Sequence, residues 1–429
     1  MNNKINEIIE LSNKYLSRMY KRYYPFIPER AEEDIIYSID GEAYIDLYSG
    51  IAVSNIGWPN PRIIKAIEEQ LNKFIHMPSI YYLEHTARLA KKLAILSPGG
   101  VLTKCFFSNS GSEANETAIA IAKRIKKVPY ILALHRSFHG RTYYAVSTTG
   151  QSNWKIGISP YAPVVFAPDP YCYRCPLGHK EYPDCGLSCA KYIEDIIKCE
   201  VGETIAAFIA EPIMANGGII VPPKDYFKEV KKILEKYSII FICDEVQTGN
   251  GRTGRLWGIE NYNVIPDIMT TSKAIANGLP LSVTMYREEY DSYLNPGEHF
   301  STLGGNAIAC VTAEIVLDEL IGKNIIKETY EKGEYFKKRL EELKEKYEII
   351  GDIRGIGLLI GIEFVKNKKT KQSGKEEAIR FLNELWKRKI LVGIGGIEGN
   401  IIRIEPPLII KKENIDYAIE VFDEVLKNI

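Results

Sequence analysis

The middle of the chain alternates short apolar runs with longer amphipathic stretches, and this alternation limits its fold more than any other feature. Buried strands are expected at 130–135, 205–210, 238–243, 267–271 and 281–286. The stretches between them, such as 225–237, have the spacing of a helix. Strands that are apolar throughout are typical of a parallel sheet covered on both faces. The repetition therefore predicts a large, doubly wound α/β domain with a mostly parallel sheet.

The C-terminal part of the chain has a different pattern. It contains a long charged helix, two apolar strands and a last helix, at 324–348, 355–364, 400–404 and 413–426. This mixture predicts a smaller α+β domain at 321–429. We expect the N-terminal segment 1–55 to join it, and residues 56–320 to form the large domain.

Composition places the chain among ordinary globular proteins and argues against two kinds of partner. Its 429 residues are 45% apolar and 26% charged, and 55 basic residues balance 55 acidic ones. A neutral balance argues against a nucleic-acid binder and against docking on anionic membranes. No apolar run reaches the roughly 18 residues that a membrane span requires, and no secretory signal is visible. We expect a cytoplasmic protein.

Charged side chains follow three of the predicted strands. Glu211, Asp244 and Lys273 each lie within two residues of a strand end. The carboxyl ends of parallel strands share one edge of a sheet, where open α/β sheets bind ligands. Each residue alone could be a strand cap or a solvated loop residue, but their convergence favours a binding site.

A segment of small polar residues, 108–117, opens a helical stretch. Ser110 and Glu113 have the spacing of a capping box, so the segment could be a well-capped helix start and nothing more. It could also be an anion cradle, because backbone N–H groups at a helix N-terminus bind phosphate. Gly111 and Ser112 would then supply amides and a hydroxyl.

A lysine, a phosphate cradle and a buried acid in one place suggest pyridoxal phosphate as the cofactor. Its aldehyde needs a lysine amine for a Schiff base, and its ring nitrogen needs a carboxylate partner. Lys273 and Asp244 match these two needs, and Gly111 with Ser112 matches the phosphate.

Several motifs carry a resemblance to one enzyme family, in the order in which that family has them. They lie at 108–116, 138–142, 211–212, 243–254, 266–280 and 299–306. With these motifs the chain resembles class III aminotransferases of PLP fold type I, and most of all the 4-aminobutyrate aminotransferases. The resemblance extends over about 46–403. It implies that family's fold and a homodimer whose two subunits together build each site.

The resemblance implies a role for each matching residue. Lys273 would bind the cofactor covalently and act as the base of the reaction, and Asp244 would pair with the ring nitrogen. The other cofactor contacts would be Gly111 and Ser112 at the phosphate, Phe138, His139 and Val246 around the ring, Gln247 near its hydroxyl, and Thr302 of the partner subunit.

The resemblance also implies how substrates bind. Arg141 and Arg403 would pair the two carboxylates of 2-oxoglutarate or glutamate, and Ile51 would form an apolar wall. In the family, the equivalent of Arg403 binds a substrate carboxylate. When the donor has no carboxylate to place at that arginine, the equivalent of Glu211 pairs with it instead. We expect an aminotransferase that moves an amino group from an ω-amino acid such as 4-aminobutyrate to 2-oxoglutarate, with ping-pong kinetics. Ornithine or acetylornithine transamination and amino-acid racemisation are the alternatives within the family.

The glycines at 249–254 formally fit the dinucleotide pattern G-x-G-x-x-G, which leaves an NAD-dependent oxidoreductase as a distant alternative. A dinucleotide loop follows its strand directly and opens a helix. This segment lies several residues past its strand, and no clear helix opens there. We expect a turn beside the cofactor.

A cysteine cluster lies in an insert at 171–189. Its members are Cys172, Cys175, Cys185 and Cys189. Their spacing is compatible with a zinc ion or an iron–sulfur cluster in a structural role. Disulfides or free thiols are the alternatives.

Overall fold

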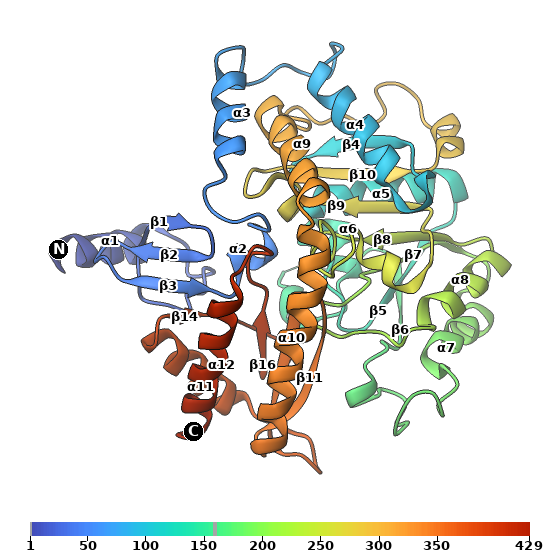
Figure 1. Cartoon of the computed structure of the whole chain (residues 1–429). Helices are drawn as coiled ribbons and strands as arrows, with labels where there is room; N and C mark the ends of the chain where they lie inside the picture. Colours follow the sequence, from blue (N-terminus) through green and yellow to red (C-terminus); the bar gives the residue numbers. More distant parts are fainter. Residues whose placement is uncertain (1, 158–160) are drawn as a thin grey trace.

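The computed structural model describes residues 2–157 and 161–429 of the chain. Figure 1 shows a large part built on one wide sheet and a smaller part that combines the N-terminal strands with the C-terminal helices. The long helix α10 (Ile325–Lys346) runs along the smaller part, next to the large one. This is the α/β architecture that the sequence predicts.

The large part contains a seven-stranded sheet with the order β4-β10-β9-β8-β7-β5-β6. Its strands are β4 (Lys104–Ser108), β5 (Tyr130–Leu134), β6 (Val164–Ala167), β7 (Ile205–Ala210), β8 (Ile240–Asp244), β9 (Ile268–Thr271) and β10 (Ser282–Tyr286). β6, β5, β7, β8 and β9 run parallel to one another. β10 is antiparallel to both β4 and β9, so the run at 281–286 is a strand of the opposite direction.

Both faces of this sheet are buried, which explains why its strands are apolar throughout. In β5, Ile131 and Ala133 pack in one hydrophobic cluster with residues of the helix α5. Leu132 and Leu134, which alternate with them, pack in a second cluster on the other face. Successive side chains of a strand point to opposite faces, so a strand covered on both sides needs an apolar residue at every position.

Helices cover the two faces. They are α3 (Pro61–Leu71), α4 (Glu84–Leu96), α5 (Gly111–Lys126), α6 (Tyr143–Thr148), α7 (Ser188–Ile196), α8 (Tyr226–Lys236) and α9 (Ala307–Gly322). In α8, Phe227, Val230 and Leu234 are buried against the sheet. Their spacing of three and four residues is the helical period that predicts this element at 225–237.

The smaller part has two sheets. Its strands are β1 (Pro28–Glu32), β2 (Ile35–Ser38), β3 (Ala43–Asp46), β11 (Ile350–Ile356), β12 (Leu359–Asn367), β13 (Gln372–Ser373), β14 (Ile390–Leu391), β15 (Gly393–Gly395) and β16 (Ile401–Ile404), and its helices are α1 (Asn2–Tyr15), α2 (Ser49–Ala52), α10, α11 (Lys375–Lys387) and α12 (Lys412–Leu426). β3 pairs in parallel with β14, so strands from both ends of the chain share one sheet.

The strand expected at 355–364 is in fact two halves of a hairpin. β11 ends at Ile356, and β12 begins at Leu359 and runs antiparallel to it. Gly357 lies between them with φ 60°. Glycine adopts this left-handed conformation without a steric penalty, so it allows the tight turn.

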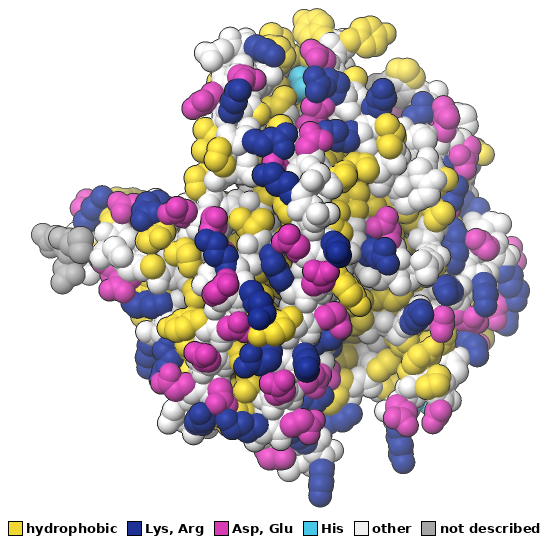
Figure 2. Space-filling view, viewed as in Figure 1, with side chains coloured by type: hydrophobic (Ala, Val, Ile, Leu, Met, Phe, Trp, Pro, Cys, Tyr) yellow, Lys and Arg dark blue, Asp and Glu magenta, His cyan; other side chains and the backbone are white. Residues whose placement is uncertain are grey.

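The charged side chains are mixed over the surface. Figure 2 shows basic and acidic groups interspersed across the visible face. Within residues 2–157 and 161–429, no helix combines the length and the apolarity that crossing a membrane would need.

Candidate active site

The ends of β7, β8 and β9 bring three charged residues to one cavity. Glu211, Asp244 and Lys273 all line it, together with the first turn of α5, and its volume is about 330 Å³. Because these strands are parallel neighbours, residues distant in the sequence meet at their carboxyl ends.

The Asp244 carboxylate is buried and fixed on both oxygens. Asn115 Nδ2 donates to Oδ2 at 2.8 Å, and His139 Nδ1 lies 2.8 Å from the same oxygen. The Val246 backbone amide donates to Oδ1 at 3.0 Å. Thr149 Oγ1 in turn accepts from the His139 backbone N–H at 3.0 Å. The carboxylate therefore has one orientation towards the cavity.

Asn115 is a residue that the sequence analysis misses. It lies one helical turn after Gly111 on the buried face of α5. A polar residue on an otherwise apolar helix face is the signal that could have identified it, since a buried amide needs hydrogen-bond partners.

Lys273 has the features of a reactive lysine. It begins the short helical segment Lys273–Ala276, and its own φ is 47°. A non-glycine residue in this left-handed region is strained, and such strain collects at functional sites. Burial lowers the pKa of its amine, while the charge of Asp244 opposes that shift. The amine is thus closer to its neutral, nucleophilic form than an exposed lysine would be.

The N-terminus of α5 forms the opposite wall of the cavity. Ser110 caps the helix by accepting from the Glu113 N–H at 3.3 Å, as its spacing predicts. Gly111 and Ser112 form the first turn, whose N–H groups have no acceptor inside the helix. A Cβ on Gly111 would lie only 2.8 Å from Val246 Cγ1, so glycine is required where the helix start meets β8.

The cavity residues fit pyridoxal phosphate. An amine, a fixed carboxylate and a helix N-terminus, which match its aldehyde, ring nitrogen and phosphate, surround one space. The side chains expected around the ring also line that space, namely Phe138, His139, Val246 and Gln247.

The expected partnership between Glu211 and Arg403 is absent from this structure. Glu211 instead accepts hydrogen bonds from the backbone amides of Phe138 at 2.9 Å and Ala215 at 3.1 Å. Burial raises the pKa of Glu211 to about 7. Arg403 pairs with Glu405, whose Oε1 lies 3.0 Å from Nε and 2.7 Å from Nη2. Glu405 follows β16 directly and lies two residues after Arg403. Side chains two residues apart on a strand point to the same face, so the strand itself brings Glu405 close to Arg403.

Four predicted residues do not line the cavity, namely Arg403, described above, and Arg141, Ile51 and Thr302. Arg141 is exposed, and its backbone N–H donates to Ser112 Oγ at 3.1 Å, so it lies at the phosphate end. Ile51 is 46% exposed and does not line the cavity, where Val53 provides the apolar contact instead. Thr302 is exposed and lies outside this cavity. Its expected contact with the partner subunit's cofactor stays a prediction.

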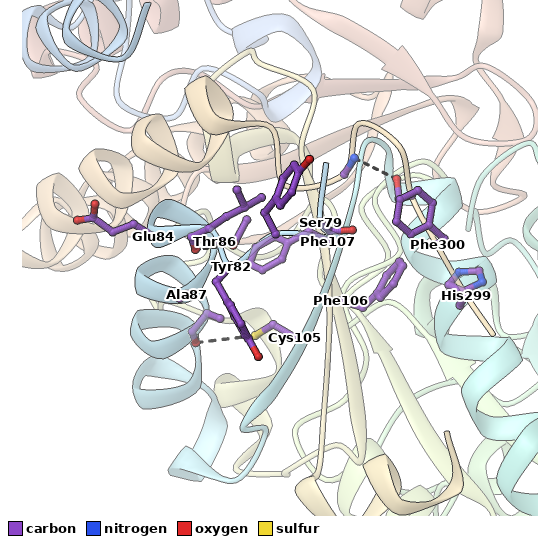
Figure 3. Close-up of a pocket in the computed structure, with 15 residues that line it drawn as sticks. Ser79, Tyr82, Glu84, Thr86, Ala87, Cys105, Phe106, Phe107, His299 and Phe300 are labelled. Carbon is purple, nitrogen blue, oxygen red and sulfur yellow. Dashed lines mark hydrogen bonds between the residues drawn. The ribbon is translucent and has the colours of Figure 1, made fainter. Parts of the chain in front are cut away.

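A second cavity, of about 490 Å³, lies beside the segment that carries Thr302. Figure 3 shows Tyr82, Phe106, His299 and Phe300 around it, from the region before α4, from β4 and from the segment before α9. Tyr82 and Phe300 are exposed. A patch of exposed aromatic side chains is typical of a surface that another protein covers.

The cysteine cluster does not form the expected metal site. Cys172, Cys175, Cys185 and Cys189 are free thiols. In the described part of the chain, no three His, Cys, Asp or Glu side chains gather into a group that could hold a metal ion. Burial raises the pKa of Cys172 to about 11 and that of Cys189 to about 12, and the neighbouring cysteines of the cluster add to both shifts.

The glycine segment 249–254 has a structural role. Its Arg252 is buried, and Nη1 donates to the carbonyls of Leu358 at 3.1 Å and Pro406 at 2.5 Å. Nη2 donates to Asn55 Oδ1. These hydrogen bonds connect the turn of the large part to segments of the smaller part. The segment therefore forms a structural turn and not a dinucleotide-binding loop.

Comparisons with known proteins find relatives that cover most of the chain. The family model described as aminotransferase class-III matches residues 15–426. A leucine/methionine racemase of Thermococcus litoralis is 38% identical, covering 99% of this chain and 96% of its own length. An acetylornithine aminotransferase of Methanothermobacter thermautotrophicus is 35% identical over 99% of both chains. A probable 4-aminobutyrate aminotransferase of Bacillus subtilis is 33% identical over 91% of both.

Solved structures of similar proteins superpose on nearly the whole chain. An aminotransferase of Bacillus anthracis superposes with a TM-score of 0.92 and 32% identity, over 100% of both chains. A taurine:2-oxoglutarate aminotransferase of Bifidobacterium kashiwanohense, solved with PLP and glutamate, has a TM-score of 0.91 and 27% identity, over 98% of this chain and 97% of its own.

Proposed function

This chain belongs to the class-III aminotransferase family, whose enzymes depend on pyridoxal phosphate, and on that premise we propose the direction of its chemistry. It moves the amino group of a donor with a terminal amine, of the 4-aminobutyrate type, to 2-oxoglutarate. Acetylornithine, named for one of the relatives above, also has its free amine at the end of its chain.

The residues of the cavity have different roles in this reaction. Pyridoxal phosphate, when bound, supplies an aldehyde that captures amines and a ring that accepts electrons. The Lys273 amine, with its lowered pKa, would take a proton from the donor carbon and pass it to the carbon of the cofactor's aldehyde group instead of returning it. Asp244, fixed by Asn115 and His139, holds a negative charge where the ring nitrogen would lie.

The ion pair between Arg403 and Glu405 is the main support for a donor with a terminal amine rather than an α-amino acid. Both side chains are buried, and their charges cancel. A donor with no carboxylate on its reacting carbon leaves this pair undisturbed. An α-amino acid brings its own carboxylate to that place and has to compete with Glu405 for the guanidinium.

The surface beside Thr302 supports a homodimer. The cavity shown in Figure 3 combines exposed aromatic side chains with the segment that the family resemblance assigns to the partner's site. We propose that a second copy of the chain covers it and that Thr302 of the partner subunit completes the phosphate site.

A donor panel tests the proposed function. Purified enzyme with pyridoxal phosphate and 2-oxoglutarate is given 4-aminobutyrate, acetylornithine, L-alanine or L-leucine, and glutamate formation is measured. We expect kcat/KM for the terminal amines to exceed that for L-alanine by about tenfold or more. A preference for the α-amino acids would contradict the proposal.

Amino-acid racemisation is the second candidate, because a leucine/methionine racemase is 38% identical to this chain. Racemisation needs no keto acid, whereas a transaminase stalls without one. Incubation of L-leucine with the enzyme, without any keto acid, followed by chiral chromatography, separates the two. Sustained D-leucine formation would favour the racemase.

A further inference from the structure

The short segment that carries Lys273 has a left-handed backbone at both of its ends. Lys273 has a φ of 47°, and Asn277 at the end of the segment has a φ of 43°. Asparagine tolerates this conformation, but a lysine is strained in it. A strained residue keeps its conformation only where its surroundings hold it. The contacts that hold this segment therefore decide where the Lys273 amine lies.

Hydrogen bonds hold the segment on each side of the lysine. Before it, Ser272 Oγ donates to the Leu281 carbonyl at 2.8 Å. After it, Asn277 uses both groups of its side-chain amide. Its Oδ1 accepts from the Ile56 backbone N–H at 3.2 Å, and its Nδ2 donates to the Gly57 carbonyl at 3.0 Å. A donor and an acceptor on adjacent backbone groups allow this amide one orientation only.

The segment that Asn277 contacts also provides a wall of the cavity. Residues 56–57 closely follow Val53, which lines the cavity together with Lys273. Asn277 does not line the cavity itself. It lies behind the wall and joins the lysine segment to the N-terminal part of the chain, so it acts on the site through Lys273.

We propose that Asn277 is a positioning residue that holds the Lys273 amine ready for the aldehyde of pyridoxal phosphate. In that reaction the Lys273 nitrogen forms a double bond with the aldehyde carbon, and the aldehyde oxygen leaves as water with two hydrogens of the amine. Loss of the Asn277 contacts slows this covalent step and leaves noncovalent binding of the ring and phosphate unchanged. The inference goes beyond the proposed function, because it concerns attachment of the cofactor and not the choice of donor.

Asn277→Gly removes both side-chain hydrogen bonds and keeps the backbone, because glycine adopts a φ of 43° freely. The contacted segment stays attached elsewhere, since Asn55 Nδ2 donates to the Asn250 carbonyl at 2.7 Å. Asn263→Gly is the matched control. Asn263 also has a left-handed φ, of 52°, but it is exposed and does not line the cavity.

The test compares covalent and noncovalent binding in the cofactor-free protein. Absorbance after mixing with pyridoxal phosphate gives the rate of bond formation, and borohydride then fixes the bond to Lys273 for peptide mass analysis. Fluorescence titration gives the Kd of pyridoxamine phosphate, which has no aldehyde and forms no such bond.

We expect Asn277→Gly to form the bond about tenfold more slowly, because a displaced amine attacks poorly. Its Kd for pyridoxamine phosphate should stay within about twofold of the parent, since the ring and phosphate contacts remain. Asn263→Gly should match the parent in both measurements. An unchanged rate in Asn277→Gly, equal losses in rate and Kd, or the same slow rate in Asn263→Gly overturns the proposal.

Hydrogen exchange in the parent protein keeps the test independent of how the variants fold. If Asn277 joins the two segments, covalent attachment at Lys273 slows exchange of the Ile56 amide more than pyridoxamine phosphate does. Equal protection by the two ligands overturns the inference. The donor panel succeeds or fails separately, since none of these measurements contains an amino-acid substrate.

Discussion

At the residue scale, Asp244 is fixed from three directions. Asn115 and His139 contact Oδ2, and the backbone amide of Val246 donates to Oδ1. A carboxylate that cannot rotate loses little freedom when a cationic group approaches it, so its charge is available without reorganisation. The sequence predicts Asp244 and His139 through their motifs, but Asn115 is found only once α5 is packed against β8.

Asp244→Asn removes the negative charge and keeps the shape. We expect kcat/KM to fall by about 100-fold or more, because the ring nitrogen loses its ionic partner. Cofactor retention after gel filtration should fall as well. Turnover close to that of the parent enzyme would contradict the role given to this carboxylate.

Glu211 predicts a dependence of stability on pH. Burial raises its pKa from the ordinary 4.5 to about 7. Between these values the folded chain keeps a proton that the unfolded chain has released, so the free energy of unfolding falls as pH rises through this window. The contribution is on the order of 3 kcal/mol.

The measurement is chemical denaturation of the cofactor-free protein at pH 5 and pH 7.5. Glu211→Gln has no proton to release, so its stability should fall less between these two values than that of the parent. Equal pH dependence in the two proteins would show that Glu211 does not carry this effect.

At the element scale, the interior of the sheet is predicted well and its edges are not. The predicted runs correspond to β5, β7, β8, β9 and β10, all of which are nearly or fully buried. The edge strands β4 and β6 are outside those runs, because each has several partly exposed positions and so a weaker apolar signal. The reversed direction of β10 is also invisible in the sequence, since a strand buried on both faces is apolar in either direction.

The start of α5 gives a prediction at this scale. Gly111→Ala places a Cβ 2.8 Å from Val246 Cγ1, so the helix start has to move away from the cavity. We expect a loss of stability of about 1–3 kcal/mol and weaker binding of pyridoxal phosphate, measured by fluorescence titration. Gly322→Ala, at the end of α9, is the matched control, because nothing lies within 4 Å of its added Cβ. Similar losses in both variants would contradict the steric argument.

At the scale of the whole molecule, Arg252 connects the two parts of the chain. Its buried guanidinium donates to Asn55, Leu358 and Pro406, which come from three separate segments. Burial lowers its pKa to about 10, and the charges of Glu405 and Asp46 oppose that shift. We expect the position of the smaller part relative to the large one to depend on this contact.

Arg252→Lys tests that connection. A lysine ammonium cannot reach all the acceptors that the planar guanidinium serves. We expect a loss of about 3 kcal/mol or more in the free energy of unfolding, as for other broken buried charge contacts. The exposed neighbour Arg255→Lys is the control and should change stability by less than about 0.5 kcal/mol. Equal stability of the two variants would contradict the role of Arg252.

The sequence by itself determined the parts of this protein that follow from local patterns. The polar residue after each buried strand and the small residues at a helix start already indicated Lys273, Asp244 and the phosphate cradle. These positions depend on the order of residues along a strand or a helix, which the chain fixes before it folds.

Only the tertiary structure decided which charges meet. Glu211 and Glu405 are both acids that could pair with Arg403, and the family resemblance implied Glu211 for donors without a carboxylate on the reacting carbon. In the folded chain the backbone amides of Phe138 and Ala215 occupy Glu211, while Glu405 contacts the guanidinium. The reason is physical: Arg403 and Glu405 lie two residues apart along one strand, whereas the packing of separate segments, which no local pattern encodes, decides which partners Glu211 meets.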